Sequence, residues 1–257
     1  MRLMANIYIA THKNYPFPPG YIPLHVGKRL SSVYVPNAIG DDSKNNISDL
    51  NPFFCELTGL YWIWQNDADD VIGLVHYRRY FKHKNDYITI KNKKIASCND
   101  LIKEFDSYDL ILPKPSYLFK KTLKEQYIKY HHEDDLIKLR QIIEKKYPDY
   151  ISTFDTVLNG NKGYYCNMFI AKKNIIEPYF QWVFDILFEL KSSLDISGYD
   201  DYQKRVFGFL SERLFAVWIE YNKNRIQITH RSVVEIESNK VISVKRYIRN
   251  FLAKLTG

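Results

Sequence analysis

Apolar residues occur along this chain in two patterns, as short continuous runs and as longer stretches with helical spacing. A continuous run of roughly four to eight apolar residues is typical of a strand that is buried on both faces. Such runs predict strands at 6–11, 71–77, 108–113 and 163–171, with weaker candidates at 226–229 and 233–236. Three prolines exclude regular structure from the segment 15–20.

Helical spacing predicts four helices between and after these strands. The first begins at Asn51-Pro52, where Asn51 serves as N-cap and Pro52 lies in the first turn. The others are expected at 133–147, from Pro178 onward, and from about 203 to 221. This order of elements predicts the α/β class: one domain over 1–237 with helical insertions, followed by a tail at 238–257.

One predicted strand ends in a cluster of basic and aromatic residues. The apolar run 71–75 passes directly into His76, Tyr77, Arg78 and Arg79. Ligands bind at the carboxyl ends of the strands in open α/β sheets, and guanidinium groups hold phosphate oxygens through paired hydrogen bonds. The sequence therefore predicts an anion clamp at this strand end. The alternative is that both arginines are solvated and only terminate the strand.

The helix predicted over 203–221 carries a carboxylate on a mostly apolar surface. Arg205, Gly208 and Glu212 share one side of this helix, at spacings of i, i+3 and i+7. A carboxylate in such surroundings is costly unless it is paired or used. Glu212 is therefore a candidate for the base that deprotonates an acceptor hydroxyl. An ion pair with Arg213, Arg205 or another basic residue is the alternative.

Two further segments hold polar residues suited to binding an acceptor. Asn167 lies amid the apolar residues of 163–171, either as a core amide or as a contact to a sugar hydroxyl, and a buried amide needs partners in both cases. The run 131–135 has the composition of a metal cluster, but neighbours on one helix turn cannot all converge on one ion. Helix capping is the main interpretation of this run, with acceptor binding by His131 or Asp134 as the alternative.

Composition and missing motifs exclude several classes. The three cysteines, Cys55, Cys98 and Cys166, are far apart and form no C-x-x-C pair, which argues against a zinc ribbon or a disulfide framework and favours a reducing cytoplasm. No 18-residue apolar stretch predicts a membrane span. Neither phosphate-binding glycine pattern nor a G-x-S-x-G elbow is present, so dinucleotide, ATP and serine hydrolase chemistry lack their signatures.

The net charge of +8 is concentrated near the C-terminus. After Glu237 the sequence has no acidic residue, while apolar residues at helical spacing alternate with Lys240, Lys245, Arg246, Arg249 and Lys254. A basic amphipathic helix of this kind indicates adhesion to an anionic membrane surface. The alternative is that its apolar stripe packs on the protein's own core. The aromatic content is 16%, with 21 tyrosines, which suits a site for sugars or nucleobases as well as an ordinary core.

Seven segments, taken in order, resemble one family. They are I-Y-I-A-T-H-K at 7–13, Y-I-P-L-H-V-G at 21–27, G-D-D-S-K-N-N-I-S at 40–48, N-P-F-F-C-E-L-T-G-L-Y-W-I-W at 51–64, I-G-L-V-H-Y-R-R-Y-F at 72–81, C-N-M-F-I at 166–170 and R-V-F-G-F-L-S-E-R-L at 205–214. The chain is similar through them to the bacterial capsular and exopolysaccharide glycosyltransferases long catalogued as domain of unknown function 4422. Only the part beyond about residue 235 lies outside this resemblance.

The resemblance implies an A-type glycosyltransferase fold, a single α/β/α sandwich that binds a nucleotide-sugar, and a role in building capsule, lipopolysaccharide or a related glycan. A-type transferases usually hold a metal with an Asp-x-Asp placed after a central strand. The triplet Asp67-Ala-Asp69 precedes the strand instead, and we interpret it as a solvated turn. His76 to Arg79 occupy the matching place, so positive side chains are expected to neutralise the diphosphate, and no divalent metal or other cofactor is expected.

These inferences assign the candidate residues to three roles. The catalytic residues are expected to be Glu212, His76, Arg78 and Arg79, with Glu56 or an aspartate at 41–42 as the alternative base. The donor is expected to contact Ala10, Thr11, His12, Asp41, Asp42, Asn46 and Tyr77. The acceptor is expected to contact Asn167, His131 and Arg205.

The expected reaction transfers a hexose from a UDP-sugar to a lipid-linked glycan at the cytoplasmic face of the membrane, with galactose, as pyranose or furanose, as our guess for the hexose. Two other classes compete with this hypothesis. A nucleic-acid binder would explain the charge and the aromatic residues, but the excess charge lies in the tail and no nucleic-acid module is visible. A non-catalytic component of the same pathway would bind a glycan or nucleotide without turning over a donor.

Overall fold

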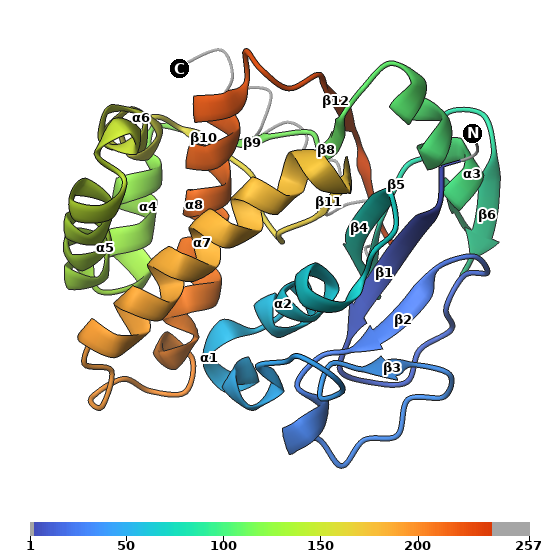
Figure 1. The fold of residues 1–257 in the computed structure, drawn as a ribbon, viewed down its shortest axis with the longest axis horizontal. Coiled ribbons are helices and arrows are strands. Elements are labelled where there is room, and N and C mark those ends of the chain that lie inside the picture. Colours follow the sequence, from blue (N-terminus) through green and yellow to red (C-terminus); the bar gives the residue numbers. More distant parts are fainter. Residues whose placement is uncertain (1–2, 238–257) are drawn as a thin grey trace. The chain divides into compact units, whose positions relative to one another are not determined.

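The computed structural model of the chain describes residues 3–237, which form two compact units (Figure 1). Unit 1 contains the residues up to Lys114 together with Met168–Phe180 and Arg225–Glu237, and unit 2 contains Pro115–Asn167 and Gln181–Asn224. The basic tail 238–257 lies outside the described residues, so its predicted amphipathic helix is not described here. No helix within 3–237 is long and apolar enough to cross a bilayer.

Unit 1 is built on a mostly parallel sheet, as the apolar runs predict. Its strands are β1 (Ala5–Thr11), β2 (Ile22–His25), β3 (Ile39–Gly40), β4 (Val71–His76), β5 (Arg79–Phe81), β8 (Leu110–Pro113), β11 (Phe169–Lys172), β12 (Ile228–Arg231) and β13 (Val233–Glu235). The order is β12-β8-β11-β4-β1-β2-β3, and only β11 runs antiparallel to its neighbours along it. The α/β class is confirmed, and β4 is an interior strand between β1 and β11.

The register of these strands aligns their carboxyl ends along one edge of the sheet. Ala10 of β1 pairs with His76 of β4, Thr11 pairs with His25 of β2, and His25 pairs with Gly40 of β3. The chain therefore leaves β1, β2, β3 and β4 at the same edge, which is the edge where ligands bind in such sheets.

The helix predicted from Asn51 is divided into α1 (Asn51–Phe54) and α2 (Leu57–Asn66). Cys55 separates them because its φ of 53° lies in the left-handed region, outside the range of a continuous helix. Asn51 is the first residue of α1 and not its N-cap, and its side-chain amide donates to the Cys55 carbonyl at 2.7 Å. Helix α2 packs so closely on β2 that a Cβ at Gly59 would lie 2.7 Å from Val26 Cγ1.

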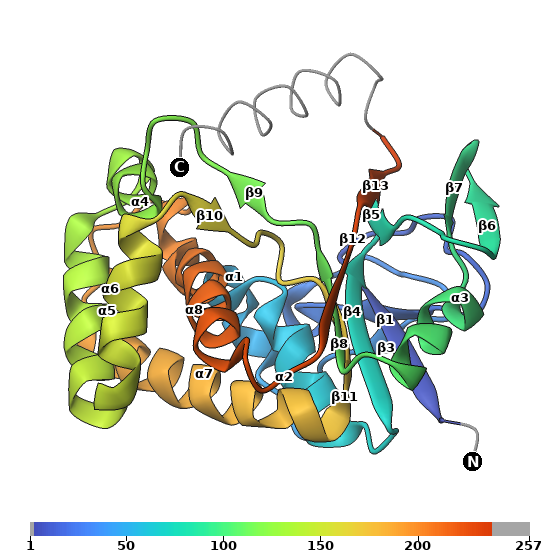
Figure 2. The same ribbon diagram turned by 90° about the horizontal axis from the view of Figure 1, so that it is seen from above.

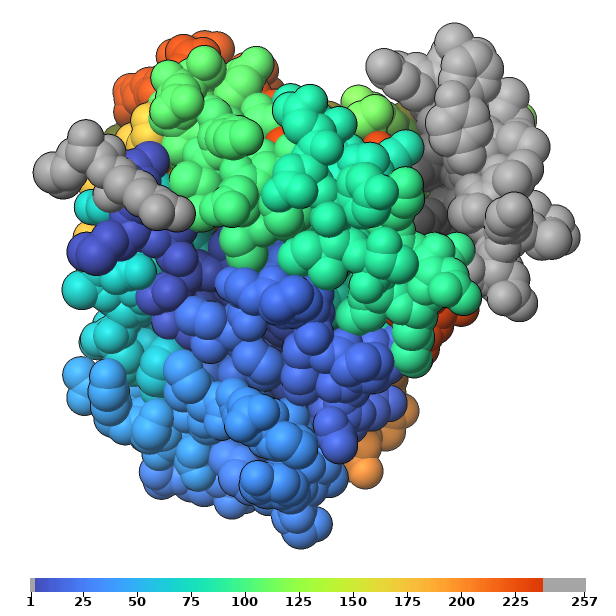
Figure 3. Space-filling view, turned by 90° about the vertical axis from the view of Figure 1, so that its right-hand side faces the viewer, coloured from blue at the N-terminus to red at the C-terminus, as the bar shows by residue number. Residues whose placement is uncertain are grey.

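A hairpin and a short helix follow β5 in unit 1: β6 (Tyr87–Ile90), β7 (Lys93–Ala96) and α3 (Cys98–Ile102). In the space-filling view they form the teal and green part of one face, above the blue N-terminal strands (Figure 3). Strand β13 pairs with β5 and lies beside β7 (Figure 2). The sequence pattern does not predict this hairpin, because its alternation is short and mostly polar.

A buried ionic network fastens α3 to the end of β12. Arg231 donates to Asp100 Oδ2 and to Glu104 Oε1, both at 2.5 Å, and all three side chains are buried. Asp100 also accepts hydrogen bonds from the backbone amides of Lys84 and Asn85 at 2.9 Å. Burial alone would raise the pKa of Asp100, but these backbone donors and Arg231 lower it to about 2.

Unit 2 is mainly helical. It contains α4 (Leu123–Tyr130), α5 (Glu133–Lys146), α6 (Ile151–Asn159) and α8 (Val206–Asn222), with a small ladder of β9 (Ser116–Tyr117) and β10 (Lys162–Gly163). Helices α5 and α8 confirm the predictions at 133–147 and about 203–221. Helix α4 opens with a capping box, in which Thr122 and Glu125 each bond the other's backbone amide.

Two sequence predictions about these segments are wrong. Helix α7 (Lys173–Ser193) begins before Pro178, which lies inside it, so the proline does not mark the start of the helix. The first turns of α7 belong to unit 1 and the rest to unit 2. The strand predicted at 163–171 is interrupted between β10 and β11, because Cys166 and Asn167 have φ values of 76° and 47°. Consecutive left-handed residues cannot continue a strand.

Candidate functional site

The end of β4 turns sharply and presents Arg78. Strand β4 ends at His76, β5 begins at Arg79, and these two residues pair with each other across the turn. The backbone amide of Tyr77 donates to the carbonyl of Ala10 at 3.2 Å, which ties the turn to the end of β1. The four residues that the sequence predicts as a clamp therefore form a tight turn at the carboxyl edge of the sheet.

The ring of Tyr77 joins the ends of β1 and β4. This buried ring packs edge-on against His12 and Tyr15, at centroid distances of 5.4 and 5.2 Å. Lys13 Nζ lies 5.4 Å from its centroid, and the Arg78 guanidinium carbon lies 5.0 Å from it. The structure thus brings together three of the predicted donor and clamp residues, His12, Tyr77 and Arg78, and surrounds one ring with cations.

Ala10 and Thr11 shape the backbone beneath this ring. Both are buried, and Ala10 accepts the hydrogen bond from Tyr77 through its carbonyl. The Thr11 hydroxyl donates to the carbonyl of Lys13 at 2.7 Å and closes the turn after β1. The two residues lie at the expected edge, and the Ala10 carbonyl and the Thr11 hydroxyl hold the backbone on either side of His12.

Both arginines of the turn contact carboxylates. Arg78 Nη1 lies 3.3 Å from Glu237 Oε2, and Arg79 Nε lies 3.5 Å from Glu235 Oε1. The Arg78 side chain is 44% exposed and the Arg79 side chain 35% exposed, so both pairs can exchange with a ligand from solution. Arg78 is exposed and Arg79 is half-buried, so both are partly solvated as the alternative holds, and each also pairs with a carboxylate. Each arginine holds an oxyanion.

Glu237 occupies a small anion site, which we call the Glu237 nest and define by Arg78, Tyr15 and Lys91. The Tyr15 hydroxyl donates to Glu237 Oε1 at 3.2 Å, and Lys91 Nζ lies 4.0 Å from the same oxygen. Lys91 also donates to the Tyr15 hydroxyl at 2.9 Å. Partial burial would raise the pKa of Glu237, but the hydrogen bonds from Arg78 and Tyr15 lower it. Sequence reasoning missed Tyr15 and Lys91, which are far from the clamp in the chain.

The predicted donor residue Asp41 has a structural role. Its side chain is completely buried, and its two oxygens accept hydrogen bonds from the amides of Gly27 and Lys28 and from the hydroxyls of Ser48 and Thr58. These four donors saturate the carboxylate. Asp41 therefore holds the loops after β2 and β3 in place, and no face of it is open to uridine or ribose.

The other two residues predicted from this loop remain nearer the surface. Asn46 donates from Nδ2 to the carbonyls of Asp42 and Lys44, at 3.1 and 2.8 Å, and closes the loop on itself. Asp42 is half-buried beside Gly40, where a Cβ would lie 2.3 Å from the Asp42 carboxylate. Gly40 thus lets the Asp42 carboxylate lie directly against the backbone at the end of β3.

His25 lies at the same edge and is a candidate that sequence reasoning missed. It ends β2, its side chain is 2% exposed, and its Nε2 forms no hydrogen bond with the described residues. Burial and then nearby Lys28 lower its pKa, so its imidazole is neutral near pH 7. A buried ring nitrogen without a partner is uncommon. The signal was present in the segment 21–27, where a histidine ends an apolar run as His76 does.

Glu212 belongs to unit 2 and is fully engaged there. Its Oε1 accepts a hydrogen bond from the Cys166 amide at 2.7 Å, and its Oε2 lies 3.2 Å from Arg213 Nη1. Arg213 is buried and also donates to the Phe209 carbonyl at 2.8 Å and to Gln126 at 2.5 Å. The ion pair that sequence analysis gave as the alternative to a catalytic base is present.

The left-handed turn at Cys166 and Asn167 is fastened to α8 at two points. One is the hydrogen bond from Cys166 to Glu212, and the other runs from Asn167 Nδ2 to Ser211 Oγ at 3.0 Å. Ser211 in turn donates to the carbonyl of Gly208 at 2.8 Å. Asn167 is buried, so in this structure it has the properties of the core amide that sequence analysis allowed.

The predicted acceptor residues His131 and Arg205 come together in unit 2. The His131 ring stacks on Phe209 with a centroid distance of 4.3 Å, and Tyr202 lies 5.1 Å from Phe209. The Arg205 guanidinium carbon lies 5.4 Å from the Phe209 centroid. His131 is thus part of an aromatic cluster, and the predicted capping is also present, because His131 is the C-cap of α4 and His132 the N-cap of α5.

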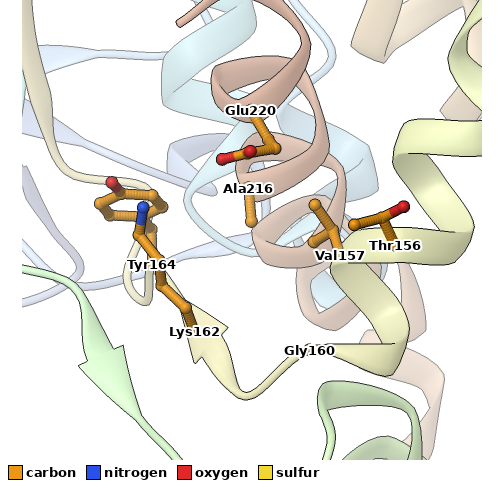
Figure 4. Close-up of a pocket in the computed structure, with 7 residues that line it drawn as sticks. All are labelled: Thr156, Val157, Gly160, Lys162, Tyr164, Ala216 and Glu220. Atoms are coloured by element: carbon orange, nitrogen blue, oxygen red, sulfur yellow. The ribbon is translucent and has the colours of Figure 1, made fainter. Parts of the chain in front are cut away.

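Two pockets lie in unit 2, and neither is lined by a predicted site residue. One lies between α6, β10 and α8 and is lined by Thr156, Val157, Gly160, Lys162, Tyr164, Ala216 and Glu220 (Figure 4). The other is lined by residues of α4, α5 and α6, with Arg140 and Asp155 bridging it at 2.7 Å. Neither holds a cluster of groups suited to catalysis.

The acidic triplet Asp67-Ala-Asp69, which precedes β4, has the predicted position but not the predicted exposure. It lies at the amino end of β4, away from the carboxyl edge, as the sequence predicts. Asp67 is buried rather than solvated, and it accepts hydrogen bonds from Tyr8 at 2.8 Å and Asn6 at 3.1 Å. Within residues 3–237, no three His, Cys, Asp or Glu side chains are grouped to hold a metal ion.

The comparisons with known proteins agree with this architecture. The family model described as "Domain of unknown function (DUF4422)" matches residues 6–224. A solved structure of the bifunctional glycosyltransferase WbbM in its apo state is similar, with 30% identity and a TM-score of 0.82 over 91% of this chain. The match covers 45% of that protein, so this chain spans less than half of its length. No curated protein matches significantly. With its family model covering most of its length, this chain belongs to the DUF4422 family.

Proposed function

We propose that this protein is a glycosyltransferase that moves a hexose from a UDP-sugar to a lipid-linked glycan in the synthesis of a bacterial surface polysaccharide. The observation that carries this proposal is the cationic turn of Tyr77, Arg78 and Arg79 at the carboxyl end of β4. It is supported by the 30% identity to a structure whose name is that of a glycosyltransferase. Galactose, as pyranose or furanose, is the hexose that we expect.

In this proposal, the donor diphosphate binds over the turn. Arg78 and Arg79 supply guanidinium groups that can each hold two phosphate oxygens. His76 precedes them at the strand end. Negative charge grows on the leaving diphosphate as the glycosidic bond breaks, and donors that are already in place stabilise it without reorganisation. The proposal assigns this neutralisation to side chains and requires no divalent metal.

The nucleotide would lie along the aligned ends of β1, β2 and β3. His12, Asp42, Asn46 and the buried ring nitrogen of His25 are at this edge. Asp41 would act indirectly, because its four hydrogen bonds hold the two loops between which the nucleotide binds.

The acceptor and the place of action are also part of the proposal. The acceptor residues that we propose, His131, Arg205 and Asn167, belong to unit 2. A lipid-linked acceptor would place the enzyme at the cytoplasmic face of the membrane, held there by the tail 238–257. Each Lys or Arg close to anionic lipid contributes about 1 kcal/mol to such binding.

Turnover tests the proposal. We expect the protein to release UDP from at least one UDP-hexose when a membrane extract provides the acceptor, with the product sugar detected by mass spectrometry. The matched control is the double variant Arg78→Ala, Arg79→Ala, in which release should fall to background. A protein that binds a UDP-hexose but never releases UDP would instead be a non-catalytic component of the same pathway.

A further inference from the structure

Unit 2 carries a surface on which three aromatic rings and one guanidinium group pack together. We call it the α8 platform and define it by Tyr202, Phe209, His131 and Arg205. Tyr202 is 53% exposed, Phe209 is half-buried and Arg205 is exposed. His131 and Tyr202 are nearly parallel, with 19° between their planes and 5.9 Å between centroids, and Arg205 lies 5.9 Å from the Tyr202 centroid. An exposed tyrosine ring and an exposed guanidinium group thus lie together at the surface of unit 2.

The hydrogen bonds around Gln203 determine which tautomer of the neutral His131 ring is present. The Gln203 side-chain nitrogen donates to the carbonyl of Tyr130 at 2.7 Å, so its oxygen must serve as the acceptor in the 2.9 Å contact with His131 Nδ1. His131 therefore carries its proton on Nδ1. The neutral ring presents Nε2 with a lone pair, to which no hydrogen bond is formed among the described residues.

The platform rests on a rigid base. The hydroxyls of Tyr127 and Tyr199 both donate to the buried carboxylate of Asp135, at 2.7 and 2.6 Å. The Tyr127 ring packs beneath His131 with a centroid distance of 4.7 Å, and the Tyr199 ring stacks on His132 at 4.2 Å. Held in this way, the His131 ring loses little conformational freedom when a ligand binds.

This combination of groups matches one face of a sugar. A hexose ring has an apolar face of C–H groups, which stacks on an aromatic ring, and hydroxyls at its rim that both donate and accept hydrogen bonds. The platform supplies the ring faces of Tyr202 and Phe209, a donor in the Arg205 guanidinium and an acceptor in His131 Nε2. A purely apolar partner would leave the His131 ring nitrogen Nε2 without a hydrogen-bond partner.

We propose that the α8 platform binds one sugar ring of the acceptor glycan, stacked on Tyr202 and Phe209, with its hydroxyls held by Arg205 and by Nε2 of His131. That this ring belongs to the acceptor rests on the proposed transferase function. Binding of the ring itself requires no donor.

Saturation-transfer NMR tests the proposal on the full-length protein. The probes are methyl β-galactopyranoside, methyl β-galactofuranoside and lactose, each without donor. We expect at least one of them to receive saturation, and Tyr202→Ala to weaken its binding roughly fivefold, the size of one aromatic contact. Tyr202 is exposed, so this variant should fold. Tyr87→Ala, which removes an exposed tyrosine from unit 1, is the matched control and should leave binding unchanged.

A pH series distinguishes hydrogen bonding by His131 Nε2 from packing of the His131 ring alone. Burial is the largest influence on its pKa and lowers it, with Arg213 acting in the same direction, while Asp135 and Gln203 oppose them. Protonation removes the Nε2 acceptor, so sugar binding should be constant above pH 6.5 and weaken as the pH falls through this lowered pKa. Exposed His132 also lies nearby and acts in the same direction as Arg213, and exposed Arg205 lies beside Phe209. In His131→Gln, the residual binding should show no such pH dependence.

The outcomes distinguish this inference from the proposed function. Saturation that is equal in the wild type and Tyr202→Ala, or that is absent for all three probes, would overturn the platform. Saturation by UMP in place of the sugars would assign it to a nucleobase instead. Donor binding is followed separately, by the stabilisation that a UDP-hexose gives to the same variants. Its absence from the wild type would contradict the transferase and leave the sugar-binding result standing.

Discussion

At the scale of single residues, the proposed chemistry requires Arg78 and Arg79 to exchange their carboxylate partners for the donor diphosphate. Arg78 and Arg79 hold carboxylates in this structure, and both pairs are exposed enough for a phosphate to replace them. Exposed ion pairs contribute only about 0–1 kcal/mol to stability. The pair of Arg78 with Glu237 is of this exposed kind. A side chain that adds so little to the fold can be altered to test function without unfolding the protein.

Replacing the clamp should remove activity and keep the fold. In Arg78→Ala and in Arg79→Ala we expect UDP release to fall by at least about tenfold, since each loses a charge-assisted hydrogen bond worth about 1.5–3 kcal/mol in the transition state. The melting temperature should remain within about 2 °C of the wild type. Arg140→Ala, at an exposed arginine ion pair of unit 2, is the control and should be fully active. Unchanged turnover in both clamp variants would refute the clamp.

Removing the charge of Glu237 should strengthen donor binding. The Glu237 carboxylate occupies the nest that the diphosphate would take, so Glu237→Gln should lower the KM for the donor roughly two- to fivefold, the size expected for a surface ion pair. Its kcat should not change. Steady-state kinetics with varied UDP-hexose measure this, with Glu144→Gln in unit 2 as the control. A higher KM in Glu237→Gln would show that Glu237 positions Arg78 rather than competing with the donor.

Glu212 has two possible roles that one substitution separates. Glu212→Gln keeps an oxygen for the Cys166 amide but removes the charge facing Arg213. If Glu212 is the base, the variant should lose transfer, retain donor binding and remain folded by circular dichroism. If the carboxylate serves only Arg213, Glu212→Gln and Arg213→Gln should lose stability and activity in parallel.

At the scale of elements, the apolar pattern predicts the strands and helices, but it does not predict the breaks caused by left-handed backbone conformations. The continuous runs give β1, β4 and β8 within one or two residues, and the charges of α5 mark both of its ends. The breaks at Cys55 and at Cys166-Asn167 have no glycine or proline to announce them. The break at Cys55 is held by a local hydrogen bond from the Asn51 side chain, and the break at Cys166 is held by a tertiary hydrogen bond to Glu212; the apolar pattern shows neither.

The network around Arg231 is the element-scale contact with the largest expected effect on stability. Asp100→Asn leaves a buried guanidinium short of a charge partner, which costs about 3–5 kcal/mol in the free energy of unfolding. Urea denaturation at pH 7 measures this cost. Asp155→Asn, at an exposed ion pair, is the control and should cost less than about 1 kcal/mol. Equal losses in the free energy of unfolding would show that the network stabilises the fold no more than an exposed ion pair does.

The same network should respond to acid with a defined sign. The folded-state pKa of Asp100 is lowered from 3.8 to about 2, so the unfolded chain takes up a proton at a higher pH than the folded one. Its contribution to stability is therefore complete above pH 4 and is lost as the pH falls toward 2. Urea midpoints of the wild type should drop through this window, and those of Asp100→Asn should drop less. A parallel decline in both proteins would exclude Asp100 as a source of the acid sensitivity.

At the scale of the whole molecule, the sequence identifies the family and predicts the clamp, but it does not reveal the groups that surround the predicted clamp residues. The segments that carry the family resemblance overlap β1, β4 and α8. The candidate residues on these three elements could therefore be found from the sequence alone. The pairing of Arg78 with Glu237 joins residues 159 apart in the chain, and the burial of Asp41 depends on donors from three separate segments. Contacts of that kind arise only from the fold.

The tail 238–257 gives a further prediction at this scale. Deleting residues 240–257 should release the protein from liposomes that contain anionic lipid, because five basic residues are lost. Co-sedimentation at low and high salt measures this, with neutral liposomes as the control. Persistent binding of the truncated protein to anionic liposomes would assign membrane contact to the described residues instead.

The most direct test of the central claim is donor binding by thermal shift, with a panel of UDP-hexoses measured in EDTA and in manganese. We predict that at least one UDP-hexose raises the melting temperature, that the rise persists in EDTA, and that it disappears in the double variant Arg78→Ala, Arg79→Ala. A rise that requires manganese would contradict the metal-independent clamp. No rise with any UDP-hexose would contradict the proposed transferase.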